Sequence, residues 1–327
     1  MTASQTGTGT GARPVALFVL GMARSGTSAL TRVLSLCGAT LPGAMIGGFV
    51  GNPLGYWEPR EVFHLDDAFL RRYGSAGYDP TLRLQEAGAI DDEERAAWIG
   101  KIRAYLTTLL AAPVVVIKHP PLVALSEMWF EAARLAGFDI AAVIAVRHPQ
   151  EVIASSSSLG RLQTGSSQEL PGALWLKYNL LSERNTRGLP RVFVEYPNLL
   201  DNWRLEVKRI SAALPIDLST RDEAAIEKYL QKDQRHQRHG GPVTELFGTD
   251  WFSAAYETLR AAARDEPWDE SALDRVFEAY RASERSFRTA FEEFNRLNKS
   301  NRAIRPSMLK LGMEVLAIVH RRKGTWA

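Results

Sequence analysis

The chain has 327 residues, of which 45% are hydrophobic and 24% are charged. These proportions are typical of a soluble globular protein with a sizeable core, and they exclude a disordered or fibrous chain. The formal net charge is only +3, and no stripe of basic residues dominates the sequence, so we expect no nucleic-acid partner. Cys37 is the only cysteine, which excludes an intrachain disulfide and predicts a reducing, cytoplasmic location.

The two ends of the chain differ in composition from its middle. Residues 1–14 are rich in Thr, Gly and Ser and predict a disordered leader without the pattern of a signal peptide. No apolar run approaches the ~20 residues that a membrane helix needs. We therefore predict a single domain over residues 15–327, with an α/β nucleotide-binding core over 15–200 and a mainly helical part over 201–327.

A short apolar run at residues 15–20 leads into a glycine turn and then into a helical pattern. Gly21 and Gly26 bracket the turn, and from Thr27 onward apolar residues recur at helical spacing. A strand, turn and helix in this order aim backbone N–H groups and the positive end of a helix dipole at one point, which suits a bound phosphate. Arg24 adds a positive charge. Hydroxyl donors are supplied by Ser25, Thr27 and Ser28.

The glycine spacing of this turn is also that of the nucleoside-triphosphate loop G-x-x-x-x-G-K-[ST]. Thr27 stands where that loop has its lysine, so the cation that would reach the β- and γ-phosphates is missing. The turn therefore favours a phosphate over a magnesium-bound triphosphate, which argues against a P-loop kinase or nucleotidase. An ordinary strand-to-helix turn, with glycines for packing only, is the structural alternative.

Strand and helix patterns alternate along the rest of the first two hundred residues. Further buried strands are predicted at residues 113–117, 140–146 and 191–196. Helices are predicted to follow at about 91–110, 122–136, from 150, and around Trp175, and later at 252–264, 270–296 and 307–322. This alternation predicts an α/β fold, a P-loop-like parallel sheet with helices on both faces.

A second anion-binding pattern follows the strand at residues 140–146. The strand ends at Arg147, Pro149 stands where a helix begins, and Ser155 faces back two turns later. A guanidinium group and a hydroxyl together can bind a phosphate through several hydrogen bonds. Two separate phosphate-binding sites suit a nucleotide with phosphates at both its 3′ and 5′ ends.

At these two stretches the chain resembles the sulfotransferases that use 3′-phosphoadenosine 5′-phosphosulfate (PAPS), of the bacterial carbohydrate and small-molecule type. Residues 24–28 match that family's [KR]-S-G-T-[ST] loop, and residues 147–155 match its R-x-P-x-x-x-x-x-S motif. The resemblance spans roughly residues 15–200. It implies that PAPS is the co-substrate, that 3′-phosphoadenosine 5′-phosphate (PAP) is the product, and that no metal takes part. It implies a 5′-phosphate site at Arg24, Ser25, Gly26, Thr27 and Ser28 and a 3′-phosphate site at Arg147 and Ser155.

Sulfuryl transfer needs a base for the acceptor hydroxyl, and two residues are candidates. Glu58 follows the donor-site helix on a Gly/Pro-rich loop, where carbohydrate sulfotransferases carry a glutamate. His119 stands one position earlier than the histidine of the K-x-H motif of cytosolic sulfotransferases. Lys118 is expected to steady the sulfuryl oxygens with either base. Glu58 is the first choice for the base, and the sequence leaves His119 open as its competitor.

Further expectations concern the nucleotide and the partners. Tyr196 resembles the family's tyrosine near the adenine, and Arg235 lies in a basic stretch, 231–241, that either closes over the 3′-phosphate or is a solvated loop. We expect the acceptor to be a carbohydrate, a glycolipid or another small molecule. Membrane contact, through the last helix, is expected only for a lipid acceptor. The second alternative is a nucleotide-binding interaction protein that never consumes its ligand.

Overall fold

The structure is a computed structural model, and it describes residues 12–48, 52, 54–160, 168–214, 216–220, 222–230, 241–247 and 249–303. Arg235, the helix predicted over 307–322 and nearly all of the predicted leader lie outside these residues. By its contacts the chain divides into two units, Met1–Phe277 and Glu278–Ala327. The first unit holds the sheet, and each unit is described by itself. That residues 15–327 form a single domain stays a prediction.

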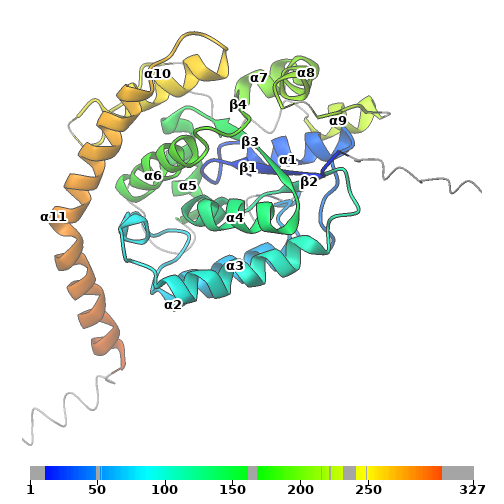
Figure 1. Cartoon of the computed structure of the whole chain (residues 1–327). Helices are drawn as coiled ribbons and strands as arrows, with labels where there is room; N and C mark the ends of the chain where they lie inside the picture. The colour runs from blue at the N-terminus through cyan, green and yellow to red at the C-terminus, as the bar shows by residue number, and fades with distance from the viewer. Residues whose placement is uncertain are drawn as a thin grey trace, which may run out of the picture. The chain divides into compact units, whose positions relative to one another are not determined.

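Four parallel strands form one sheet, in the order β2-β1-β3-β4 (Figure 1). Val15 at the start of β1 pairs with Val114 of β2 and with Asp139 of β3. Nearly every strand residue is buried, because helices cover both faces and leave no face for polar side chains. The predicted α/β class and parallel sheet are therefore confirmed. The strands are β1 (Val15–Leu20), β2 (Val114–Ile117), β3 (Asp139–Val146) and β4 (Arg191–Glu195).

One face of the sheet packs against α1 (Thr27–Leu36) and α8 (Trp203–Ala213). Leu17 and Val19 of β1 belong to the same buried cluster as apolar residues of both helices, such as Leu30. These strand residues alternate with residues of the opposite face, as the two-residue period of a strand requires.

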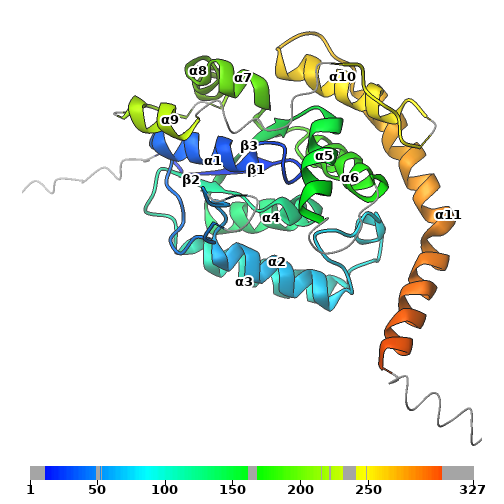
Figure 2. The ribbon, with the colours of Figure 1, turned by 180° about the vertical axis from the view of Figure 1, so that it is seen from behind.

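The other face is covered by α4 (Ser126–Ala136) and α6 (Glu169–Asn185) (Figures 1 and 2). Phe18 of β1 meets Phe130 of α4 edge to face, with 5.0 Å between the ring centroids. Outside α4 lies α3 (Asp92–Thr107), whose Asp91 N-cap accepts hydrogen bonds from the backbone N–H groups of Glu93 and Glu94.

Several predicted boundaries differ from those in the structure, and two of the differences lie beside prolines. The helix predicted from residue 122 begins as a separate 3₁₀ helix, η2 (Pro120–Leu125), and α4 starts only at Ser126. The strand predicted over 191–196 ends at Glu195, because Tyr196 opens the short helix α7 (Tyr196–Asp201) with a proline in its first turn. The remaining helices are α2 (Arg60–Arg72), η1 (Arg83–Gln85), α5 (Pro149–Gly160), α9 (Glu223–Tyr229), α10 (Trp251–Ala263) and α11 (Glu270–Ala303).

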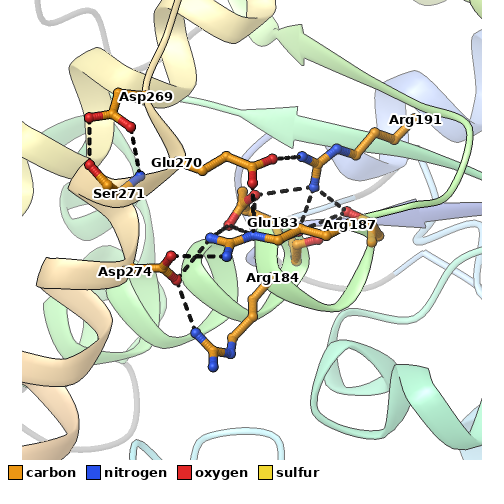
Figure 3. Close-up of polar contacts among 10 residues, drawn as sticks. Glu183, Arg184, Arg187, Arg191, Asp269, Glu270, Ser271 and Asp274 are labelled. Atoms are coloured by element: carbon orange, nitrogen blue, oxygen red, sulfur yellow. Dashed lines mark hydrogen bonds and ion pairs between the residues drawn. The ribbon is translucent and has the colours of Figure 1, made fainter.

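An ionic network joins α6, β4 and the first turns of α11 within the first unit (Figure 3). Glu183 is 1% exposed and accepts hydrogen bonds from Arg187 and Arg191. The same two arginines also reach Asp274 and Glu270 of α11. The network fixes where α11 begins on the outside of the sheet domain. Among the described residues, no helix combines the length and apolar character needed to cross a membrane.

Candidate active site

The turn after β1 is shaped by two close backbone approaches. Gly21 has φ 118° and Gly26 has φ 91°, so both lie in the left-handed region that favours glycine. A Cβ at Gly21 would lie 2.7 Å from the carbonyl oxygen of Ala145, and one at Gly26 would lie 2.2 Å from Cδ2 of Tyr196. The turn is therefore pressed against β3 and against the start of α7. Arg24, at its tip, also has a positive φ, 73°.

The hydroxyls of this turn differ in what they contact. Ser25 is fully buried, and its Oγ has no hydrogen-bond partner among the described residues. Ser28 donates to the carbonyl oxygen of Tyr56 over 3.1 Å. An unpaired hydroxyl in a buried position costs free energy unless a ligand or water satisfies it, so Ser25 marks a place for an acceptor oxygen.

The two arginine motifs, far apart in the sequence, meet at the carboxyl ends of β1 and β3. Nε of Arg24 donates to Oγ of Ser155 over 2.9 Å, and Nη1 of Arg147 donates to the carbonyl oxygen of Arg24 over 2.9 Å. The guanidinium of Arg147 is held by Glu151 at 2.7 Å and lies 4.7 Å from the ring centroid of Tyr196. Four of the predicted nucleotide residues are thus linked by successive contacts, from Ser155 through Arg24 and Arg147 to Tyr196.

The electrostatics of this cluster favour an anion. Burial lowers the pKa of Arg24, and the nearby positive charge of Arg147 lowers it further. Both effects show that two positive charges close together in a half-buried site repel each other and lack solvation. A bound phosphate would reduce this unfavourable energy.

The three candidate catalytic residues also come together, at the end of β2. Lys118 is 2% exposed, and its Nζ lies 2.5 Å from Oε1 of Glu58 and 3.0 Å from the carbonyl oxygen of Tyr56. Its third contact, 3.3 Å to Oγ of Ser28, links this cluster to the turn after β1. Burial lowers the pKa of Lys118, and the Glu58 carboxylate acts in the opposite direction. The lysine is therefore a buried bridge between the two clusters.

His119, the next residue, is held on its other side by a residue that the sequence analysis missed. Its Nδ1 lies 2.6 Å from Oδ2 of Asp66 on α2, and its Nε2 lies 3.9 Å from Oε2 of Glu58. Asp66 is 1% exposed, and its second oxygen accepts a 2.8 Å hydrogen bond from Nε1 of Trp129. The pKa of Asp66 is raised above its usual value, because burial is the largest effect and the bonds to His119 and Trp129 offset only part of it.

The segment that carries Glu58 is anchored through its neighbour Trp57, which contacts residues of α9 and α1. Trp57 has φ 56°, a strained conformation for an aromatic residue. Its Nε1 donates to the hydroxyl of Tyr229 over 3.1 Å, and the guanidinium of Arg32 lies 4.4 Å from its ring centroid. These contacts stabilise the strained conformation of Trp57 and so hold the neighbouring Glu58 in the site.

Some of these partners left a signal in the sequence. Asp66 falls on the apolar stripe of α2 between Val62 and Phe69, where a carboxylate is out of place, and Glu151 stands four residues after Arg147. The predicted residues Arg24 to Ser28, Glu58, Lys118, His119, Arg147, Ser155 and Tyr196 all border these two clusters. In the described ranges, no group of three or more His, Cys, Asp or Glu side chains is arranged to hold a metal ion.

The described residues thus define an α/β protein whose parallel sheet presents paired basic and acid–base clusters at its carboxyl edge. No family model matches the chain, and no curated protein matches it. The solved structures that are similar to it include two sulfotransferase domains.

The first is the sulfotransferase domain from the Synechococcus PCC 7002 olefin synthase, at 17% identity and a TM-score of 0.39, covering 85% of this chain and 98% of that one. The second is the sulfotransferase domain from the curacin biosynthetic pathway, at 14% identity and a TM-score of 0.41, covering 78% and 99%. At these identities and TM-scores neither structure defines a role for any residue of this chain, so the chemistry below follows from its own side chains.

Proposed function

We propose that the chain is a sulfotransferase that moves a sulfuryl group from PAPS to an acceptor hydroxyl on a carbohydrate, glycolipid or other small molecule. The observation that carries this proposal is the meeting of two phosphate-binding motifs. Arg24 bonds Ser155, and Arg147 bonds the backbone of Arg24, so both arginines face one small region. A nucleotide with separate phosphates on one ribose requires two such cationic groups close together.

The residues present fit this ligand. Among the described residues the Oγ of Ser25 has no hydrogen-bond partner and no side chain caps the N–H groups at the start of α1, which suits the 5′-phosphate. Arg147, with the hydroxyl of Ser155, suits the 3′-phosphate. Tyr196 lies under Arg147 and beside Gly26, where it would border the nucleoside. When bound, PAPS supplies the sulfuryl group.

The acid–base cluster supplies the rest of the chemistry. Nε2 of His119 has no hydrogen-bond partner among the described residues, whereas Glu58 is engaged by Lys118. We therefore assign His119 as the base that takes the proton of the acceptor hydroxyl. Lys118 lies between Ser28 and Glu58 and would neutralise negative charge on the oxygens around sulfur. Glu58 holds Lys118 in place and stabilises the protonated histidine.

The test is calorimetric titration of the full chain with PAP, with adenosine 5′-phosphate and with ATP plus Mg²⁺. We expect PAP to bind most tightly. Arg147→Ala should weaken PAP by about 10- to 100-fold, the range for one lost charge-assisted contact, and should change adenosine 5′-phosphate little. Arg13→Ala, which removes an arginine that bonds the carbonyl oxygens of Gly137 and Phe138 at the opposite edge of the sheet, is the matched control.

Three outcomes would contradict the proposal. Tighter, magnesium-dependent binding of ATP would favour a kinase or nucleotidase. Equal losses for PAP and adenosine 5′-phosphate in Arg147→Ala would remove the role of Arg147 at the 3′-phosphate. Binding of PAP without transfer of ³⁵S from labelled PAPS to any of a panel of sugar, glycolipid and phenol acceptors would favour an interaction protein.

A further inference from the structure

The buried carboxylate of Asp66 sits between two fixed hydrogen-bonding groups. Oδ1 accepts from the indole N–H of Trp129 over 2.8 Å, and Oδ2 lies 2.6 Å from Nδ1 of His119. Trp129 is completely buried, and Asp66 and His119 are 1% and 4% exposed. Neither oxygen of Asp66 is left to water, so the orientation of the carboxylate is fixed.

The chemistry of the indole decides which atom carries the proton. An indole nitrogen only donates, so Oδ1 of Asp66 must accept from Trp129. With Asp66 ionised, Oδ2 is also an acceptor, and the facing Nδ1 of His119 must then carry the ring proton. Nε2 of the neutral ring is left as an acceptor, and it is the nitrogen that lies 3.9 Å from Glu58.

We propose that Asp66 is a positioning residue that selects the His119 tautomer protonated on Nδ1, so that Nε2 can act as the base. This inference rests on the proposed sulfotransferase function. In the reaction, the acceptor oxygen forms its bond to sulfur as the bond between sulfur and the phosphate oxygen of the donor breaks. The acceptor proton passes to Nε2, and Asp66 stays ionised and stabilises the resulting imidazolium.

The Trp129 contact gives the isosteric variant Asp66→Asn a defined outcome. The amide oxygen is drawn to the indole N–H, so the amide NH₂ faces Nδ1 of His119. Nδ1 must then accept, which moves the ring proton to Nε2 and disables the base. Trp129→Phe removes the indole donor, so in the double variant the amide is free to turn its oxygen toward His119 and restore the working tautomer.

The first measurement is ¹⁵N NMR of the full chain with labelled histidine, recorded from pH 6 to 9, with His119→Gln to assign the signal. We expect the neutral His119 ring to carry its proton on Nδ1 in the wild type and in Asp66→Asn/Trp129→Phe, and on Nε2 in Asp66→Asn. A wild-type ring protonated on Nε2 would overturn the proposal, since Asp66 would then itself be the donor. This readout needs neither nucleotide nor acceptor.

The second measurement is steady-state transfer of ³⁵S from PAPS. Asp66→Asn should lower kcat by about two orders of magnitude or more, with KM for PAPS unchanged. Adding Trp129→Phe should raise kcat at least about tenfold above that of Asp66→Asn, whereas a purely structural role predicts a further loss, since Trp129 is part of the core. Unfolding curves check that each variant is folded.

Wild-type kcat in Asp66→Asn, or no gain in the double variant, would overturn the positioning role. If the wild type transfers no sulfate while the tautomers behave as expected, the proposed function fails and the assignment of the Asp66–His119 pair is upheld. The two failures are therefore distinguishable.

Discussion

The side chain of Lys118 connects several parts of the candidate site. Its ammonium group bonds Glu58, the carbonyl oxygen of Tyr56 and the hydroxyl of Ser28, which come from three separate segments. The pair with Glu58 is almost fully buried, in contrast to the exposed ion pair between Arg71 and Asp67 on α2. Because both charges have lost their water, each depends on the other.

We expect Lys118→Met to lower the free energy of unfolding by about 3 to 5 kcal/mol, because it leaves the Glu58 carboxylate buried without a counter-charge. Adding Glu58→Gln should recover part of this loss, because the second change removes the unpaired charge. Arg71→Met, which breaks the exposed pair, should cost under about 1 kcal/mol. The measurement is denaturant unfolding of Lys118→Met, of Glu58→Gln, of their double variant and of Arg71→Met, and strictly additive losses for the Lys118 and Glu58 changes would contradict the expected coupling.

Individual residues also show which contacts could be predicted from the sequence and which could not. Arg24 and Arg147 could be placed because each lies in a short pattern at the end of a buried strand, and the topology brings such ends together. The partners of His119 could not be placed, since Asp66 is 53 residues away from it and Trp129 is 63 residues away from Asp66. No local pattern encodes such pairings.

At the scale of elements, the loop between α2 and η1 is held by a second buried lysine. Lys177 of α6 is 3% exposed and donates to the carbonyl oxygens of Asp79 and Thr81 over 2.8 and 2.7 Å. The Asp79 carboxylate in turn accepts from the hydroxyls of Ser75 and Thr81. A Cβ at Gly77 would lie 2.7 Å from Cγ of Pro121, so the loop packs directly beside the segment that carries His119.

The loop should make the chain sensitive to acid. Burial, the largest single effect, acts to raise the pKa of Asp79, but Lys177 and the bonds from Ser75 and Thr81 together hold it below its usual 3.8. The folded state then binds this proton less tightly than the unfolded chain. The stabilisation is therefore complete above about pH 4 and is lost as the pH falls through the folded pKa.

We expect Asp79→Asn to lower the free energy of unfolding at pH 7, and its difference from the wild type to shrink below pH 4. Lys177→Met should raise the pKa of Asp79 and shift the acid loss to higher pH. Urea unfolding between pH 7 and 2.5 measures both. A constant difference between the wild type and Asp79→Asn at all pH values would show that the carboxylate charge plays no part.

The strands show why elements were easier to predict than their boundaries. A strand buried on both faces needs a continuous apolar run, so the run at residues 113–117 located β2 (Val114–Ile117) to within one residue. The start of α7 at Tyr196 has a proline in its first turn, and α4 starts at Ser126 only after the separate 3₁₀ helix η2, features that an apolar pattern does not register.

At the scale of the whole first unit, the network in Figure 3 links the first turns of α11 to α6 and β4. The carboxylate of Glu183 is buried and forms ion pairs with Arg187 and Arg191. Asp274, by contrast, is 41% exposed and pairs with arginines at the surface. The network therefore combines one buried acid with weaker peripheral pairs.

Glu183→Gln should lower the free energy of unfolding by about 3 kcal/mol, because two arginines lose their buried counter-charge while the side chain keeps its size. Asp274→Asn, at the exposed rim of the same network, should cost under about 1 kcal/mol. Guanidinium unfolding compares the two. Similar small losses would mean that the buried carboxylate is no more important than the rim.

The central position of β1 has a consequence for how the chain is made. Its first residue, Val15, aligns with Val114 and with Asp139, so the strand that leaves the ribosome first has no neighbour in the sheet until about a hundred further residues have been translated. Arg147, Ser155 and Tyr196 emerge later still. A nascent chain therefore carries β1 as an unpaired apolar strand until Val114 and the rest of β2 have been made, and its nucleotide pocket can form only after Tyr196 has followed.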